Sequence, residues 1–211
     1  VSPKELRSMP KVLERVNLVK EMRLNSSALG TRKLAERSHE FRETKNPNTY
    51  LIIPRVSSES RRYIPIGFLD SDTIPTDSVT IIEDASLYDF GILTSNVHMA
   101  WMRTVAGRLK RDYRYSKDIV YNNFPWPEPT KEQKDKIEKT AKQILEVRKK
   151  YKDSSLAELY NEITMPIELR EAHRENDKAV MEAYGFRGQK MKESECVRRL
   201  MELYKKIIDK E

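Results

Sequence analysis

The sequence predicts an α+β protein, with a mixed α/β domain that contains a small sheet over residues 1–128 and an all-helical domain over residues 129–211. Three observations lead to this prediction. Short segments rich in β-branched and aromatic residues lie between residues 50 and 82, separated by turn-forming residues. Apolar residues recur at intervals of three and four on both sides of these segments, which is typical of packed helices. After Pro129 the chain changes to long helical runs.

The first predicted elements are a helix and three strands. Residues 4–24 carry apolar side chains at helical intervals, and Pro3 and Pro10 limit where a helix can begin. The strands are expected at residues 50–54, 63–68 and 78–82. The first two strands contain prolines, which cannot donate a hydrogen bond to a neighbouring strand. An edge or bulged position is therefore expected for both.

Residues 85–105 predict two helices, because their apolar residues follow a helical spacing that is broken near residues 94–95. Gly107 can stop the second helix. The aromatic and β-branched residues that follow, up to Tyr121, favour an extended chain.

Four helices are expected in the all-helical domain, at residues 131–151, 155–160, 166–184 and 192–208. Thr130 can cap the first helix, while Pro166 can begin the third and Gly185 can end it. His173 and Asp177 are neighbours on that helix without a nearby serine or cysteine, so we expect a capping or packing role and not catalysis. By these features alone, the segment is a small helical bundle.

The net charge of +7 lies in the first third of the chain, since residues 1–62 hold 14 basic and seven acidic residues. Such a charge favours a phosphate-rich partner, although it also fits an anionic membrane. No apolar run approaches the roughly 20 residues that span a membrane. The single cysteine, Cys196, fits a reducing cytoplasm and has the helical spacing of a packed thiol. The three histidines are dispersed, so no metal site is expected.

The most informative segment is residues 103–117, where six basic residues accompany a single acid and two tyrosines. This composition is typical of a surface that lies against nucleic acid. In an extended chain, side chains two apart share a face, so Lys110, Asp112 and Arg114 would form a row. In the major groove a cation donates to guanine and a carboxylate accepts from cytosine. A solvated loop, or a ladder of salt bridges among the three side chains, would account for the same residues.

A second candidate patch lies between two predicted strands and comprises Arg55, Ser57, Ser58, Arg61 and Arg62. Arginine and hydroxyl groups in such a turn suit phosphate oxygens, and Arg111, on the opposite face of the extended run, is assigned the same role. Alternatively, the patch residues cap the turn and pair with Glu59. Ser78 and Thr80 are candidates for a base contact from a neighbouring strand.

Several stretches together resemble the MmeI-like (Type IIL) restriction-modification enzymes. Residues 87–127, LYDFGILTSNVHMAWMRTVAGRLKRDYRYSKDIVYNNFPWP, resemble the target-recognition region of that family almost word for word. Residues 49–70, TYLIIPRVSSESRRYIPIGFLD, are similar to a family pattern PRVSSERRxYIPxGF, with Ser60 where the family usually has arginine. Residues 155–186, SLAELYNEITMPIELREAHRENDKAVMEAYGF, and 193–207, ESECVRRLMELYKKI, are similar to the helical domain that ends those enzymes.

The resemblance implies a piece of one polypeptide that carries a nuclease, a helical spacer, an adenine N6-methyltransferase using S-adenosylmethionine, a recognition domain and a C-terminal helical domain. This chain resembles only the last two. The implied function is recognition of a specific double-stranded DNA sequence, with DNA and the methyltransferase domain of its own chain as partners. Lys110 and Asp112 match positions through which the family varies its target base, and Arg114 matches an arginine that usually remains.

No catalytic, cofactor-binding or metal-binding residue is expected in this chain. Adenine methyltransferases need a glycine-rich turn for the cofactor and an (Asp/Asn)-Pro-Pro-(Tyr/Phe) loop for the flipped base. The six glycines form no GxG, and residues 122–127, NNFPWP, lack the Pro-Pro pair. S-adenosylmethionine and magnesium are therefore expected in other domains. The competing function is a protein-interaction or regulatory domain that docks through its basic surface, and its binding would not respond to base sequence.

Overall fold

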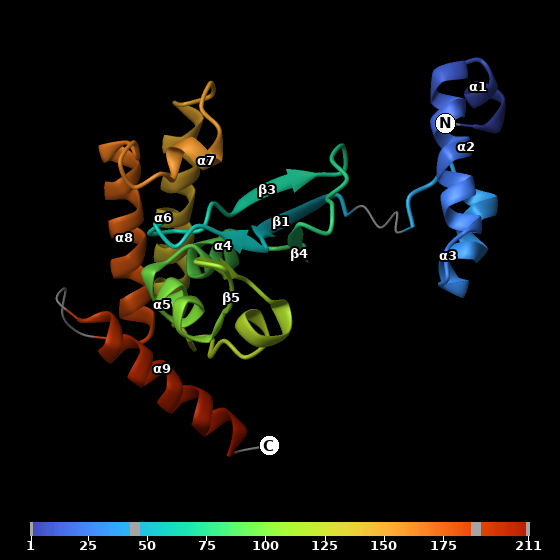
Figure 1. Cartoon of the computed structure of the whole chain (residues 1–211). Coiled ribbons are helices and arrows are strands. Elements are labelled where there is room, and N and C mark those ends of the chain that lie inside the picture. Colours follow the sequence, from blue (N-terminus) through green and yellow to red (C-terminus); the bar gives the residue numbers. More distant parts are fainter. Residues whose placement is uncertain (1, 43–46, 187–190, 210–211) are drawn as a thin grey trace. The chain divides into compact units, whose positions relative to one another are not determined.

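The computed structural model describes residues 2–42, 47–186 and 191–209. The chain divides into two compact units, residues 1–46 and residues 47–211, both drawn in Figure 1. Helices are combined with small antiparallel sheets, which confirms the predicted α+β class.

The first unit is helical. Its elements are α1 (Pro3–Arg7), α2 (Pro10–Leu24), α3 (Leu29–Lys33) and the 3-10 helix η1 (Leu34–Arg37). The predicted helix over residues 4–24 is divided, because Pro10 lacks an N–H group and is suited to the first position of α2. Arg23 is buried in this unit, and its guanidinium donates to three backbone carbonyls at 2.8 to 2.9 Å, those of Leu34, Arg37 and Glu40.

The second unit contains an antiparallel sheet in the order β3-β1-β4. Its strands are β1 (Thr49–Pro54), β3 (Gly67–Asp70) and β4 (Val79–Glu83). Of the edge or bulged position expected for the two proline-containing strands, the edge position is confirmed for β3, whereas β1 is central and not an edge strand. A central strand can hold Pro54 because this residue ends the strand and β3 pairs only as far as Ile52.

The second strand begins later than predicted. Residues 63–66 are largely buried and form no ladder, so that β3 begins only at Gly67. Pro65 has no N–H group to donate, and the N–H of Ile64 donates to the sulfur of Met99 at 3.4 Å. A tertiary contact thus replaces strand pairing here.

The two helices predicted from residues 85–105 are confirmed as α4 (Leu87–Leu93) and α5 (Asn96–Val105). The hydroxyls of Ser86 and Ser95 cap them, and Asp89 completes a capping box at α4. The break between the helices is therefore a second N-cap.

The extended chain predicted up to Tyr121 is wrong at its end. Residues there form a π-helical turn, η2 (Lys117–Tyr121), which buries Val120. The indole N–H of Trp101 donates to the carbonyl of Val120 at 3.0 Å. Packing against α5 overrides the local preference of these residues for a strand.

The four predicted C-terminal helices are confirmed as α6 (Lys131–Lys149), α7 (Leu156–Leu159), α8 (Ile167–Ala183) and α9 (Glu193–Ile208). Thr130 caps α6 in a capping box, Pro166 is the N-cap of α8, and Gly185 follows α8 with a φ of +65°. These three local signals act as predicted. Among the described helices, none is long and apolar enough to cross a membrane.

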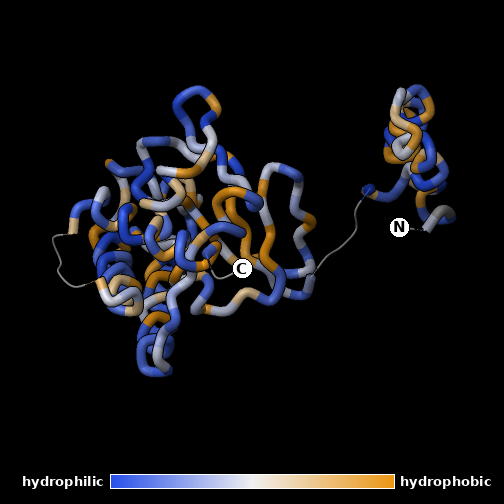
Figure 2. The backbone as a smooth tube through the Cα atoms, turned by 90° about the horizontal axis from the view of Figure 1, so that it is seen from below, coloured by the Kyte–Doolittle hydropathy of each residue, from blue (hydrophilic) through white to orange (hydrophobic). Residues whose placement is uncertain are grey.

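One hydrophobic core joins the sheet, α4 and α5 to the C-terminal helices. Helices α6 and α8 run side by side and both contact α4, while α9 lies against α5 (Figure 1). Figure 2 shows apolar stretches gathered inside this unit and hydrophilic residues along its outer loops. The C-terminal helices thus share a core with the preceding residues and do not form a bundle by themselves. The domain boundary predicted between residues 128 and 129 stays a prediction.

Helix α4 approaches α6 closely at Gly91. A Cβ atom at this position would lie 2.6 Å from Cγ2 of Ile137 and 3.2 Å from Cβ of Ala141. The carbonyl of Gly91 accepts a hydrogen bond from the side-chain amide of Asn176 at 2.8 Å. The Oδ1 atom of Asn176 accepts in turn from the hydroxyl of Thr140 at 3.0 Å. A bare backbone is therefore required where the three helices meet.

We expect Gly91→Ala to lower the free energy of unfolding by about 1–3 kcal/mol, because the added methyl group overpacks the α4–α6 contact. Gly30→Ala in α3 is the matched control, since a Cβ atom there meets nothing within 4 Å and alanine favours a helix. Urea denaturation followed by circular dichroism measures both. A Gly91→Ala variant as stable as the unmodified protein would show that α6 can move away without cost.

Candidate nucleic-acid interface

The basic and aromatic run forms a β-hairpin in a second sheet. Strands β5 (Gly107–Leu109) and β6 (Asp112–Arg114) pair antiparallel, and β2 (Val56–Ser57) pairs with the other side of β6. Lys110 and Arg111 form the two-residue turn, and Lys110 has a φ of 57°, in the left-handed region. The single extended run predicted after residue 107 is therefore wrong, because the chain reverses at Lys110.

One face of this sheet points outward. Cross-strand partners share a face, so Leu109 lies beside Asp112, and Arg114 lies between Gly107 and Val56. Leu109, Val56 and Arg114 are exposed. The predicted common face of Asp112 and Arg114 is thus present, whereas Lys110 stands at the tip of the hairpin and is not part of the row.

The other face of the hairpin packs on the protein. Tyr113 is only 8% exposed, and the guanidinium carbon of Arg108 lies 3.8 Å from the centroid of its ring. The same guanidinium donates to the carbonyl of Arg111 at 2.9 Å and so braces the turn. Just beyond β6, the hydroxyl of Tyr115 lies 3.0 Å from Nε2 of His98 in the core. Burial lowers the pKa of His98 to about 3, so this imidazole is neutral at physiological pH.

The backbone of Arg55 joins the two sheets. Its N–H group donates to the carbonyl of Ser78 at 2.9 Å, and its carbonyl accepts from the N–H group of Tyr115 at 2.8 Å. Ser78, proposed as a base-reading residue, is exposed, and its hydroxyl lies 2.6 Å from that of Thr76. Thr80 lies within β4 opposite Ile53 and is partly exposed. Ser78 therefore lies close to Arg55. The backbone of Arg55 in turn connects it to Tyr115, just beyond the end of the hairpin.

The predicted phosphate-binding residues are not all accessible. Arg55 and Arg62 are exposed, and Ser58 and Arg61 are partly exposed. Ser57 is only 2% exposed, and its hydroxyl has no partner among the described residues. It pairs with Tyr113 on the inner face of the sheet, so the prediction that Ser57 binds a phosphate is corrected.

The alternatives to an open binding surface find partial support in the side-chain contacts, because the hydroxyl of Ser58 accepts from the N–H group of Ser60 at 3.3 Å and so caps the turn. Among the described residues, Asp112 forms no ion pair with Lys110 or Arg114, so the alternative of a salt-bridge ladder among these three side chains is not observed. Glu59 lies 3.8 Å from Arg108, in the hairpin, and forms no ion pair with the described arginines of its own loop.

Arg103, counted among the basic residues of this segment, has an internal role. Its guanidinium forms two bonds with the carboxylate of Glu193 in α9, at 2.8 and 2.9 Å. It also donates to the carbonyl of Arg62 at 3.1 Å. Arg103 therefore links α9 to the loop between β2 and β3, which carries Arg61 and Arg62 and is called the basic loop below.

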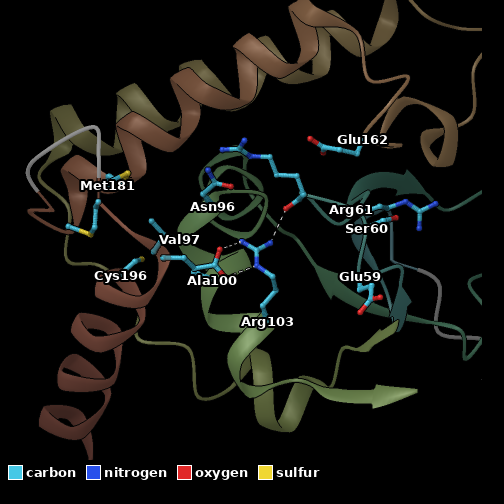
Figure 3. Close-up of a pocket in the computed structure, with 13 residues that line it drawn as sticks. Glu59, Ser60, Arg61, Asn96, Val97, Ala100, Arg103, Glu162, Met181 and Cys196 are labelled. Atoms are coloured by element: carbon cyan, nitrogen blue, oxygen red, sulfur yellow. Dashed lines mark hydrogen bonds and ion pairs between the residues drawn. The ribbon is translucent and has the colours of Figure 1, made fainter. Parts of the chain in front are cut away.

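A pocket of about 510 Å³ lies beside this ion pair (Figure 3). Its polar lining combines arginines with glutamates, and its apolar lining includes Val97, Ala100, Met181 and Cys196. The charged lining residues are Arg61, Arg62, Arg103, Glu59, Glu162 and Glu193. Cys196 is buried, which confirms the packed thiol predicted from the helical spacing.

Asp177 fastens the start of α5 to α8. One carboxylate oxygen accepts from the N–H group of Asn96 at 2.7 Å, and the other accepts from the hydroxyl of Tyr63 at 2.8 Å. The ring of Tyr63 stacks on His173, with centroids 4.2 Å apart. These contacts confirm the capping and packing role predicted for His173 and Asp177. The partners could not be predicted, because they lie more than 80 residues away in the sequence.

Sequence reasoning missed Arg148, which looks like an ordinary basic residue of a solvated helix. Its guanidinium is buried, donates to the carbonyl of Ile66 at 2.7 Å and to the hydroxyl of Tyr160 at 2.8 Å, and lies over the ring of Phe90. No local signal marks it. Arg148 holds the end of the basic loop, which precedes β3, against α6.

Comparisons with known proteins agree with this geometry. Residues 1–128 match the family described as "MmeI, target recognition domain", and residues 129–210 match "MmeI, C-terminal domain". DNA methyltransferase A of Bacillus subtilis (strain 168) is 43% identical over 209 residues, which cover 98% of this chain and 23% of that protein. A solved structure of the Type IIL restriction-modification enzyme MmeI in complex with DNA is 44% identical, with a TM-score of 0.92 over 99% of this chain and 28% of that chain. The chain thus spans about a quarter of the length of these relatives.

The Asp177 carboxyl should make stability depend on pH. Burial raises its pKa from 3.8 to about 6, so the folded state holds this proton more tightly than the unfolded state. As pH rises from about 4 to about 6, the folded protein must give up this proton, so the contribution of Asp177 to the free energy of unfolding falls. Above that range the contribution stays constant. Relative to Asp177→Asn, the free energy of unfolding should therefore fall across this window, by up to about 3 kcal/mol.

Denaturation of both proteins at several pH values measures that difference. Asp135→Asn, which changes an exposed carboxyl on α6, is the matched control. A difference between the Asp177→Asn variant and the unmodified protein that is independent of pH would contradict the raised pKa.

Proposed function

The chain belongs to the family in which the MmeI target recognition domain is followed by the MmeI C-terminal domain, and on this premise we propose that it recognises a specific sequence of double-stranded DNA within a longer restriction-modification protein. The observation that carries this proposal is the hairpin of β5 and β6. Its inner face is packed, and its outer face presents Asp112 and Arg114 without an internal partner among the described residues.

A two-stranded β-ribbon fits the major groove of B-DNA, where the donor and acceptor pattern identifies each base pair. Arg114 can donate to guanine and Asp112 can accept from the amino group of cytosine. A carboxylate that faces DNA is repelled by phosphates and loses hydration, so it needs a donor to offset the cost. Cytosine N4 supplies that donor. Lys110 at the tip and Ser78 beside Arg55 complete the proposed set of base-reading residues.

The proposed phosphate contacts come from the residues that border this ribbon, namely Arg55, Ser58, Arg61, Arg62 and Arg111. They set the register of the protein on the duplex without reading bases. Arg103 and Arg148 support them from inside by bonding to the backbone of the same loop. The basic loop is therefore held in place before DNA arrives.

We place the chemistry of the longer protein outside this chain. In this proposal a methyltransferase domain of the same polypeptide binds S-adenosylmethionine and modifies adenine, a nuclease domain uses magnesium, and the protein works in the cytoplasm. This chain supplies the site preference. Its partners are then double-stranded DNA and that methyltransferase domain.

The proposed function is tested by incubating the chain with a random pool of DNA duplexes and sequencing the bound fraction. We expect one short motif to be enriched. Heparin, a polyanion without bases, should compete for the protein at low salt but leave the enriched motif unchanged. Equal affinity for all duplexes would overturn the proposal and favour docking on an acidic protein through the basic surface.

The paired change Lys110→Glu with Asp112→Arg should alter one base pair of the enriched motif. If Lys110 donates to guanine and Asp112 accepts from the paired cytosine, exchanging cation and carboxylate should switch the preferred base from G to C. Each single change should cost about 1–3 kcal/mol of discrimination at that position. The same selection experiment on the three variants measures this, and an unaltered motif in a folded double variant would return both residues to a structural role.

Replacing Arg55, Arg61 or Arg62 by alanine should weaken binding to all duplexes alike. Each lost phosphate contact should lower the slope of log K against log salt by about 0.9 and leave the motif unchanged. Lys149→Ala, at an exposed position on α6, is the control. Titrations at several salt concentrations measure the slope, and three variants with unchanged slopes would exclude these side chains from the DNA contact.

A further inference from the structure

The outer face of the hairpin is not uniformly polar. Leu109 is 52% exposed and lies directly beside Asp112, and Val56 is 42% exposed and lies beside Arg114. On the opposite face Tyr113 and Ser57 are buried, whereas all three residues of the edge strand β5 are exposed, and Leu109 among them. An apolar side chain therefore stands within the row proposed to read bases.

The largest apolar group that base edges offer in the major groove is the C5-methyl group of thymine. Leu109 can neither donate nor accept a hydrogen bond, so against any other base edge it would cover a polar group without pairing it. Against a thymine methyl group it would remove apolar surface from water on both sides. The chemistry of this position thus selects among the four bases.

The spacing also suits such a contact. Neighbouring strands lie about 4.8 Å apart, and successive base pairs of B-DNA are separated by about 3.4 Å. With the strands lying across the duplex axis, a residue one strand over from Asp112 is displaced along that axis by between one and two base-pair steps. Leu109 is on β5, the free edge of the sheet and next to the turn, where no further strand stands between it and a duplex.

We propose that Leu109 is a specificity-determining residue that selects thymine by contact with its 5-methyl group, in the base pair next to the one that Asp112 reads. This inference rests on the proposed function and adds a preference that the charged residues do not provide. Val56, which lies on the far side of β6, is not required for it.

The experiment starts from the duplex that the chain itself enriches from a random pool. Each thymine of the motif is replaced in turn by deoxyuridine, which removes the methyl group and keeps every hydrogen-bonding group. We expect one such replacement to weaken binding about three- to fourfold, the factor that corresponds to burial of one methyl group. Replacement at other thymines should have little effect.

Variants at Leu109 connect the effect to this side chain. Leu109→Ala and Leu109→Thr should both lower the ratio of thymine to deoxyuridine affinity at that position, because their methyl groups lie closer to the backbone, and Leu109→Met should retain the full preference. Threonine favours a β-strand, so Leu109→Thr should keep the hairpin folded. This variant therefore distinguishes loss of the thymine contact from loss of the hairpin. Leu24→Ala, at an equally exposed leucine of α2, is the matched control and should keep the ratio.

The outcomes separate this inference from the proposed function. A motif without thymine, or one whose thymines all tolerate deoxyuridine, would overturn the role of Leu109 and leave DNA recognition intact. A thymine preference of unchanged size in both Leu109→Ala and Leu109→Thr would assign the contact to another residue and also overturn it. The absence of any enriched motif would instead overturn the proposed function, and the inference with it.

Discussion

The second unit depends on how closely α4 can approach α6. With a side chain at Gly91, the two helices could not meet at their observed distance, and the carbonyl of Gly91 would lose its bond with Asn176 of α8. This contact fuses the C-terminal helices with the segment that precedes the hairpin. The recognition surface therefore stands on a core made by residues from nearly the whole unit.

Polar side chains of the helices extend this core to the basic loop. Arg148 bonds to the carbonyl of Ile66, Arg103 bonds to the carbonyl of Arg62, and Asp177 accepts from the hydroxyl of Tyr63. Each contact joins a residue of a helix to the loop that carries the proposed phosphate contacts. The C-terminal helices contribute none of the proposed base-reading residues, and their part in the proposed function is to position that loop.

A few contacts also hold the hairpin in place. Tyr113 and Tyr115 bury one side of β6, and the backbone of Arg55 links that strand's continuation to β4. What remains for a partner is a narrow row of a carboxylate, a guanidinium and two apolar side chains, with two cations at the tip. A few side chains on this ribbon can be exchanged without disturbing the core, because they lie on its outer face and do not pack into the core.

The sequence by itself determined the helices and their limits, since serine and threonine caps, Pro10, Pro166 and Gly185 act on the residues beside them. It also determined the family resemblance and the segment in which the proposed site lies. Only the tertiary structure decided that the chain turns at Lys110, that Ser57 is buried and that Arg103 meets Glu193. The reason is that strand pairing and burial depend on partners distant in the sequence, and a local pattern of charges and β-branched residues fits a single strand and a hairpin equally well.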